Sequence, residues 1–350
     1  MKKIHLVFAA AAILLFAGAG CITIGAPAAQ GNDGGVWKSI NNGTDFAQSN
    51  LAPTPQGVGN INGISILDLV FDPQDNKAIY MASAGSGLFY TWDGAQSWKY
   101  VDGLGMGSIN SVAIDFKYKC TLYTAMQNKV WKSIDCARSW KSQYFDTRGD
   151  VSVSAVAVDP ANSNIVYGGL SKGDLIKSTD GGATWSTIHR FNNKINKILI
   201  HPTNSKMIFV AMQNDGLWKS RDAGVNWTDL RPKMDKFSGT NEIYDFDVDK
   251  DAKTMYLTSI YGIIVSEDLG ESWRKIDLLT PPGSVHIYSF AVNPNKAQEI
   301  YYSTASTFYS SFDGGKNWST KKLPTSRAGT ALLVDPKNPS LLYLGTRKFE

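Results

Sequence analysis

The chain has 350 residues, of which 43% are hydrophobic, and its formal net charge at pH 7 is +4. This length and apolar content are enough for a large buried core, in one or two domains. Lys2 and Lys3 lie in a segment that we expect to be removed, which leaves a nearly neutral mature chain. Because nucleic-acid-binding proteins usually carry a basic stripe, we expect no nucleic-acid partner.

The first 21 residues have the pattern of a bacterial export signal. A positive start precedes an apolar run over residues 4–20, which is short for a membrane-spanning helix. In one interpretation, Gly18-Ala19-Gly20-Cys21 resembles a lipobox and Cys21 carries a lipid. In the other, ordinary cleavage after Ala28 releases a soluble secreted protein. Both predict export. We favour a lipid-anchored protein of the cell envelope, with residues 22–35 as a flexible tether.

A short motif with Ser or Thr, Asp, Gly and Trp recurs along the rest of the chain, and we call it the box. Successive boxes lie 42 to 52 residues apart, the period expected of four-stranded blades in a β-propeller. A degenerate first copy has Asn41 and Phe46. The conserved positions in the other six copies are Asp93, Asp135, Asp180, Asp222, Asp268 and Asp313, with Trp98, Trp140, Trp185, Trp227, Trp273 and Trp318.

A second series of turns precedes each of these six boxes by about 20 residues and often begins with Asp-Pro or Asn-Pro, a turn signal. Together the two series define six continuous blades, each with strands A to D from the axis outwards. One A–B hairpin is left over at the C-terminus, and one C–D hairpin, at residues 36–46, at the N-terminus. We therefore predict an all-β fold, a single seven-bladed propeller over residues 36–350, closed by pairing of these two hairpins.

The box has the residues of a structural turn. Its Asp accepts hydrogen bonds from turn N–H groups, its Gly permits a positive φ, and its Trp buries a ring between neighbouring sheets. Copies spread around a ring cannot all face one site. The box carboxylates are therefore poor candidates for catalysis.

The box at residues 178–185 resembles the Asp-box, or bacterial neuraminidase repeat, of sialidases, sortilin-type receptors, xyloglucan-active glycoside hydrolases and photosystem II assembly factors. Over residues 36–350 the chain is most similar to the photosystem II stability/assembly factor-like group, which are single, exported and often lipidated propellers. That resemblance implies a non-enzymatic assembly role. The chain departs from the group's arginine-rich patch, since its few Arg are scattered, and it has no sialidase-type Arg-Ile-Pro element near its start.

Two cysteines remain in the mature chain apart from Cys21. Cys120 opens strand B of the second blade, and Cys136 follows the Asp of its box. Folding the B–C hairpin at residues 127–128 brings the two within one residue of register. Outside the cytoplasm this favours a disulfide. The alternative is two unpaired thiols.

Catalytic candidates are few. No metal-binding or phosphate-binding motif occurs, so we expect no metal and no cofactor. Glycoside hydrolysis needs two facing carboxylates. Asp68 and Asp245 on the innermost strands are the candidates, with Lys197 between them. The alternative is a solvated channel with balancing charges.

The face opposite the boxes is the better candidate for binding. It carries the D–A and B–C loops, and three D–A loops are long: residues 51–63, 231–242 and 278–286. Amides, hydroxyls and aromatic rings there suit a peptide or a glycan. Some of these side chains are alternatively strand-end hydrogen bonders. The predicted binding residues are Asn110, Asn196, Tyr244, His286, Tyr288 and Arg327.

We therefore expect an exported, membrane-tethered, monomeric scaffold that binds a protein or glycan partner of the cell envelope without catalysis. The first alternative is a glycoside hydrolase or sialidase-like enzyme that uses Asp68 and Asp245. The second is a carbohydrate-binding module without turnover.

Overall fold

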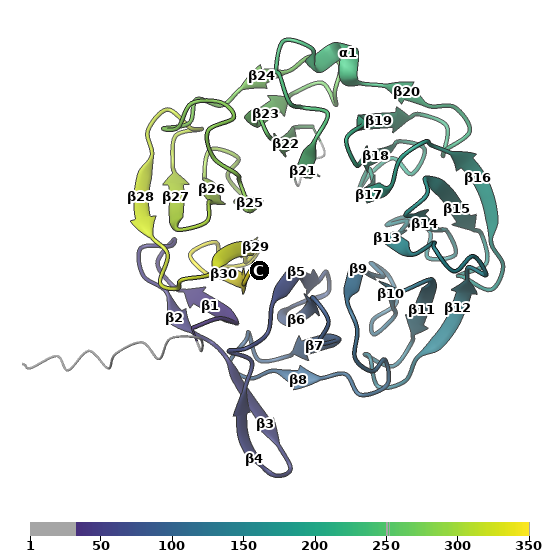
Figure 1. The fold of residues 1–350 in the computed structure, drawn as a ribbon, viewed down its shortest axis with the longest axis horizontal. Coiled ribbons are helices and arrows are strands. Elements are labelled where there is room, and N and C mark those ends of the chain that lie inside the picture. Colours follow the sequence, from purple (N-terminus) through teal and green to yellow (C-terminus); the bar gives the residue numbers. More distant parts are fainter. Residues whose placement is uncertain (1–32, 250, 252, 350) are drawn as a thin grey trace, which may run out of the picture.

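The computed structural model describes residues 33–249, 251 and 253–349. Within them, seven four-stranded antiparallel sheets surround a central axis as the blades of a propeller (Figure 1). This confirms the predicted all-β fold and its blade count. No helix in the described residues is long and apolar enough to cross a bilayer. Cys21 and the tether up to residue 32 lie outside the described part.

Each blade runs from its innermost strand A to its outermost strand D. Blade 1 is β5 (Ile66–Asp72), β6 (Asp75–Ser83), β7 (Leu88–Thr91) and β8 (Lys99–Tyr100). Blade 2 is β9 (Ile109–Ile114), β10 (Leu122–Met126), β11 (Lys129–Ser133) and β12 (Lys141–Phe145). Blade 3 is β13 (Val153–Val158), β14 (Val166–Leu170), β15 (Asp174–Ser178) and β16 (Ser186–Arg190). Blade 4 is β17 (Ile195–Ile200), β18 (Ile208–Met212), β19 (Gly216–Ser220) and β20 (Thr228–Asp229). Blade 5 is β21 (Ile243–Val248), β22 (Met255–Ser259), β23 (Gly262–Ser266) and β24 (Arg274–Lys275). Blade 6 is β25 (Ser289–Val292), β26 (Ile300–Ser303), β27 (Thr307–Ser311) and β28 (Ser319–Lys322).

Blade 7 combines strands from both ends of the chain. Its order from the axis is β29 (Ala328–Val334), β30 (Leu342–Arg347), β1 (Val36–Ser39) and β2 (Ala47–Gln48). The antiparallel register between β1 and β30 runs from Val36 opposite Gly345 to Ser39 opposite Leu342. This pairing is consistent with closure of the ring by the two terminal hairpins, which leaves no open edge between the first and last strands.

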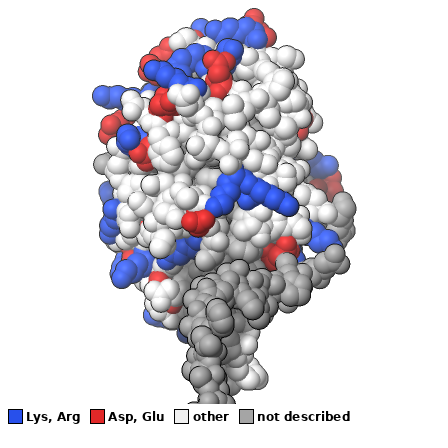
Figure 2. Space-filling model, turned by 90° about the vertical axis from the view of Figure 1, so that its left-hand side faces the viewer, with Lys and Arg blue, Asp and Glu red and all other residues white. Residues whose placement is uncertain are grey.

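The outer edge of the ring carries charges of both signs. Figure 2 shows the side with β28, where Lys and Arg are interspersed with Asp and Glu over a largely uncharged surface. On this side there is no continuous basic patch. The picture agrees with the nearly neutral composition of the chain.

The box turns are built as the sequence predicts. In blade 3, the Ser178 hydroxyl donates to Asp180 Oδ1 at 2.8 Å, and Asp180 accepts from both the N–H and the hydroxyl of Thr184. The hydrogen bonds from Thr184 hold the pKa of Asp180 at about 2, so the carboxylate stays ionised. The degenerate first copy keeps the arrangement, since Ser39 donates to Asn41 Oδ1 at 2.9 Å.

Each box turn also contacts the preceding blade. In blade 2, Tyr123 and Lys132 face each other across strands B and C. Both donate to the carbonyl of Gly181, which follows the box Asp of blade 3, at 2.9 and 2.8 Å. The sequence analysis missed this contact, which we call the Tyr–Lys pair. Its equivalents are Tyr343 and Lys38 on Gly94, Tyr167 and Lys177 on Ala223, and Lys219 with Phe209 on Leu269.

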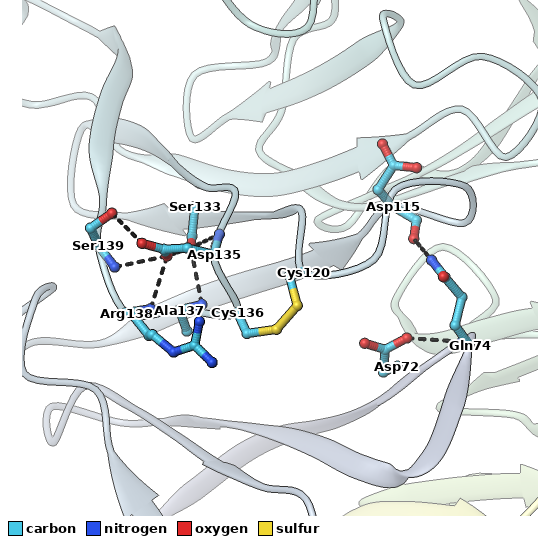
Figure 3. Close-up of a disulfide and its surroundings, with 10 residues drawn as sticks. All are labelled: Asp72, Gln74, Asp115, Cys120, Ser133, Asp135, Cys136, Ala137, Arg138 and Ser139. Carbon is cyan, nitrogen blue, oxygen red and sulfur yellow. Dashed lines mark hydrogen bonds between the residues drawn. A yellow bond between two sulfur atoms is a disulfide. The ribbon is translucent and has the colours of Figure 1, made fainter.

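Three junctions lack the lysine of the Tyr–Lys pair. Residues Tyr90, Val265 and Ser310 stand at that position in blades 1, 5 and 6. Blade 1 precedes the box of blade 2, and there Cys136 forms a disulfide with Cys120 (Figure 3). The same two residues share a backbone hydrogen bond of 3.1 Å from Cys136 N–H to Cys120 O. The disulfide thus ties the box turn of blade 2 to the A–B turn of its own blade.

Two of the long D–A loops contain regular structure that the sequence did not predict. The loop before blade 1 folds into a hairpin of β3 (Leu51–Thr54) and β4 (Gly57–Asn60), which projects from the ring in Figure 1. Its base is held by Asn50, whose amide donates to Asn62 Oδ1 at 2.7 Å. The loop before blade 5 contains the short helix α1 (Arg231–Met234). Pairing between β3 and β4 stabilises the hairpin, and the buried side chain of Met234 anchors the helix. Neither feature produces a periodic pattern in the sequence.

We predict that replacing Lys132 by Met lowers the free energy of unfolding by about 1–2 kcal/mol. Met keeps an apolar stem beside Tyr123 but removes a donor to the Gly181 carbonyl. The readout is the midpoint of urea unfolding. Lys119→Met, which changes an exposed lysine of the same blade, is the matched control and is expected to be neutral. Equal midpoints for the two variants would contradict the role assigned to the pair.

We also predict that the Cys120→Ser/Cys136→Ser double variant loses about 3 kcal/mol, because the bridge closes a loop with a sequence separation of 16. Urea midpoints with and without reductant test this. Reductant is expected to shift the wild type to the midpoint of the double variant and to leave the variant unchanged. A wild type that reductant does not shift would argue against a stabilising bridge.

Candidate functional site

The innermost strands bring one lysine and three carboxylates together around the axis. Lys197 on β17 donates to Asp245 on β21, with an Nζ–Oδ1 distance of 2.7 Å. Asp68 on β5 and Asp247 on β21 both interact electrostatically with the same ammonium group. The structure therefore places Asp68, Asp245 and Lys197, from three separate blades, in one charged cluster.

The surrounding blades shift the pKa values of Asp68 and Lys197. Enclosure by the protein raises the pKa of Asp68 to about 6, with Lys197 opposing the shift and Asp245 adding to it. The Asp68 side chain is nevertheless exposed to the channel, and water there screens its charge. For Lys197, burial lowers the pKa, but the charges of Asp245 and Asp247 outweigh burial and the net shift is upward.

The two candidate carboxyl groups differ in how well their surroundings suit glycoside hydrolysis. Asp68 has the raised pKa of a general acid, as one of the two carboxyl groups of a glycosidase requires. Asp245, the second candidate, is neutralised by its direct ion pair with Lys197. Among the described residues, no group of His, Cys, Asp and Glu side chains is arranged to hold a metal ion. The cluster has the character of a partly balanced, solvated channel.

The face opposite the boxes carries the D–A loops, and we call it the D–A face. On this face, three side chains at the starts of A strands join neighbouring blades. Each donates to the carbonyl of the first residue of the next blade's A strand, so these are strand-end hydrogen bonders. The Asn110 amide is thus engaged in the fold although the residue is exposed, and its contribution to binding stays a prediction. The three hydrogen bonds are Asn110 to Val153, Ser154 to Ile195 and Thr330 to Ile66, at 2.8, 2.6 and 2.6 Å.

Blades 5 to 7 present aromatic rings on the same face. The rings of Tyr244 and His286 have centroids 3.9 Å apart, those of His286 and Tyr288 4.3 Å, and those of Tyr288 and Phe349 5.0 Å. The Arg347 guanidinium lies 4.9 Å from the centroid of the Phe349 ring. We call these four rings the aromatic row. Three predicted binding residues are thus in contact with one another.

The aromatic row is partly open and largely uncharged near pH 7. His286 is exposed, Tyr244 and Tyr288 are half-buried, and Phe349 is 47% exposed. Partial burial lowers the pKa of His286, with Glu242 opposing the shift, so the imidazole is neutral at pH 7. Burial also raises the pKa of Tyr244. The row is therefore a polarisable surface whose polar atoms remain available for hydrogen bonds.

Two other predicted residues lie apart from the row. Asn196 is exposed at the start of β17. Arg327 is buried, and its guanidinium faces Asp33 at 3.8 Å and the carbonyls of Gly63 and Ile64. Arg327 therefore has a structural role in the fold, and its part in binding stays a prediction. It ties the start of the described chain to the loop before blade 1.

A hollow of about 260 Å³ lies in the connection between blades 5 and 6, which also carries His286. Its walls include Tyr261 and residues 275–282, with two prolines among them. The Thr280 hydroxyl is buried without a hydrogen-bond partner among the described residues. The D–A face therefore offers a hollow as well as the aromatic row.

Sequence reasoning missed Phe349 and Arg347 because Arg347 ends the last strand of the repeat and Phe349 follows it. Their positions depend on the packing of blade 7 against blade 6, which brings the end of β30 close to Tyr288. No local pattern marks such a contact. The box register predicted the other rings, since it identifies the start of each A strand.

Comparisons with known proteins support the fold more strongly than any activity. No protein-family model matches the chain. One stretch is 31% identical over 147 residues to a xyloglucanase of Hypocrea jecorina (strain QM6a), and the match covers 35% of this chain and 17% of that enzyme. The chain therefore spans much less than two thirds of that relative.

Solved structures with the same fold have diverse functions. A GH74 xyloglucanase from Xanthomonas campestris has a TM-score of 0.66 at 18% identity, covering 81% of this chain and 51% of its own. YCF48 bound to D1 peptide has a TM-score of 0.61 at 16% identity, covering 81% and 94%. An extracellular domain of a one-component system from B. thetaiotaomicron has 0.62 at 17%, covering 86% and 42%. At these identities the likeness shows the propeller fold alone.

We predict that Lys197→Met destabilises the protein in a pH-dependent way. At pH 8 the variant leaves Asp68, Asp245 and Asp247 without their shared cation, so its Tm falls below that of the wild type. A raised folded-state pKa favours the protonated form, so the stability linked to Asp68 is present at low pH and is lost as pH rises through about 6. The Tm deficit is therefore expected to shrink towards pH 4. Lys119→Met is expected to follow the wild type throughout, and a deficit that does not vary with pH would contradict the assignment.

Proposed function

We propose that this chain is an exported, membrane-tethered propeller that binds a protein or glycan partner of the cell envelope on its D–A face, without catalysis. The observation that carries the proposal is the aromatic row, in which Tyr244, His286 and Tyr288 come from two blades and remain accessible. Aromatic rings are enriched at binding hot spots because they provide large contact areas at low entropic cost. The opposite face carries the box turns, and we call it the box face. Its turns hold the fold together.

The attachment of the described chain also favours use of the D–A face. The Asp33 carboxylate accepts from the Ser326 N–H at 2.6 Å and from the Thr325 hydroxyl at 3.2 Å. These contacts hold the residues preceding β1 on the D–A face. A tether through residues 22–32 to a lipid on Cys21 would then present this face towards the membrane. A partner close to the membrane surface would meet the aromatic row.

The proposal is tested by screening glycan and peptide arrays with the wild type and two Tyr variants. Tyr288→Ala is expected to weaken any binding found by about tenfold or more. Tyr118→Ala is the matched control, because Tyr118 is an exposed ring in an A–B turn on the opposite face. Binding that survives Tyr288→Ala, or that depends equally on Tyr118, would place the partner elsewhere.

A glycoside hydrolase is the second candidate. It is supported by the raised pKa of Asp68, which lies in one cluster with Asp245, and by the partial match to a xyloglucanase. Reducing-end release from xyloglucan oligosaccharides, measured with the wild type, Asp68→Asn and Asp245→Asn, separates the two functions. The exposed Asp150→Asn is the control. Turnover by the wild type that both channel variants abolish would refute the non-enzymatic proposal.

A further inference from the structure

The residues that follow β30 place the Phe349 side chain on the aromatic row. β30 makes its last backbone pairing at Arg347, opposite Ala328. Lys348 and Phe349 continue beyond the strand, and no described hydrogen bond holds the backbone of either. The Phe349 ring packs on Tyr288 with an angle of 40° between the ring planes. The row is thus completed by a segment that the sheet does not anchor.

The contacts that hold the Phe349 ring are weak enough for another side chain to replace it. They consist of one ring pair with Tyr288 and one cation–π contact with Arg347, and nearly half of the ring remains exposed. Contacts of these two classes together favour the occupied state by about tenfold. A competing side chain of similar chemistry can therefore displace the ring.

The geometry also restricts what can replace Phe349. Tyr244 and Tyr288 both contact the imidazole of His286 in tilted arrangements, with ring-plane angles of 38° and 46°. Tilted rings in mutual contact do not form the single flat face against which a sugar would lie. The exchangeable position is the one on Tyr288, and its present occupant is an aromatic ring on a short polypeptide segment beyond β30.

We propose that Phe349 is an intramolecular occupant of a recognition site for an aromatic side chain on an extended segment of a partner polypeptide. This inference rests on the proposed binding function and selects a polypeptide over a glycan. In the resting protein the Phe349 ring covers Tyr288. A partner binds by displacing that ring, so the Phe349 ring sets a threshold for binding.

The experiment uses the full chain and the pentapeptide Gly-Thr-Arg-Lys-Phe, which is the sequence of residues 345–349. Fluorescence anisotropy of the labelled peptide is measured with the wild type and with Phe349→Ala. Because the wild-type site is occupied for most of the time, Phe349→Ala is expected to bind the peptide about tenfold more tightly. The peptide Gly-Thr-Arg-Lys-Ala is expected not to bind.

Tyr288→Leu in the Phe349→Ala background tests the site, since it keeps apolar bulk at a half-buried position outside the strands and is expected to remove peptide binding. Equal affinities of the wild type and Phe349→Ala, no binding to either, or binding that survives Tyr288→Leu would each overturn the inference. An array ligand that needs Tyr288, found while the pentapeptide fails to bind, would leave the proposed function standing and refute this inference alone.

Discussion

At four of the seven junctions, the propeller depends on the contact between the carbonyl after the box Asp and the blade before it. The Ser–Asp hydrogen bonds shape the turn so that this carbonyl points towards the neighbour, as at Asp180 and Gly181. The Tyr–Lys pair then donates to it, with the ammonium partly buried, so that burial lowers the pKa of Lys132. A buried cation is tolerated because the carbonyl and the Tyr ring offset its desolvation. The same arrangement spans the composite blade, where strands from both ends of the chain supply Lys38 and Tyr343.

Because the box turns hold the blades together, the proposed binding site lies on the opposite, D–A face. The box face is committed to turns and to contacts between blades, and the disulfide reinforces it at the blade 2 box, where the preceding blade supplies Tyr90 in place of lysine. The D–A face connects blades with loops of variable length. It could therefore acquire a hairpin, a short helix and the aromatic row without disturbing the repeat.

The channel and the aromatic row differ in what they are suited to do. In the channel, Lys197 and Asp245 satisfy each other, and Asp68 remains exposed to water with a raised pKa. That arrangement balances charge around the axis. The row brings Tyr244, His286 and Tyr288 into contact and keeps them accessible, which is what recognition requires. The occupancy of Tyr288 by Phe349 indicates the kind of side chain that the row accepts.

The sequence alone determined the all-β class, the number of blades and the position of each blade along the chain, because Asp, Gly and Trp recur at the period of a repeated four-stranded unit. It also identified Asp68, Asp245, Tyr244 and Tyr288 as residues at the starts of inner strands. Only the tertiary structure decided which of the candidates meet. Asn110 and Arg327 have residue types suited to binding, yet the fold uses both internally. Phe349 lies outside the repeat and reaches Tyr288 only when blade 7 packs against blade 6, and a contact between separate blades leaves no local pattern.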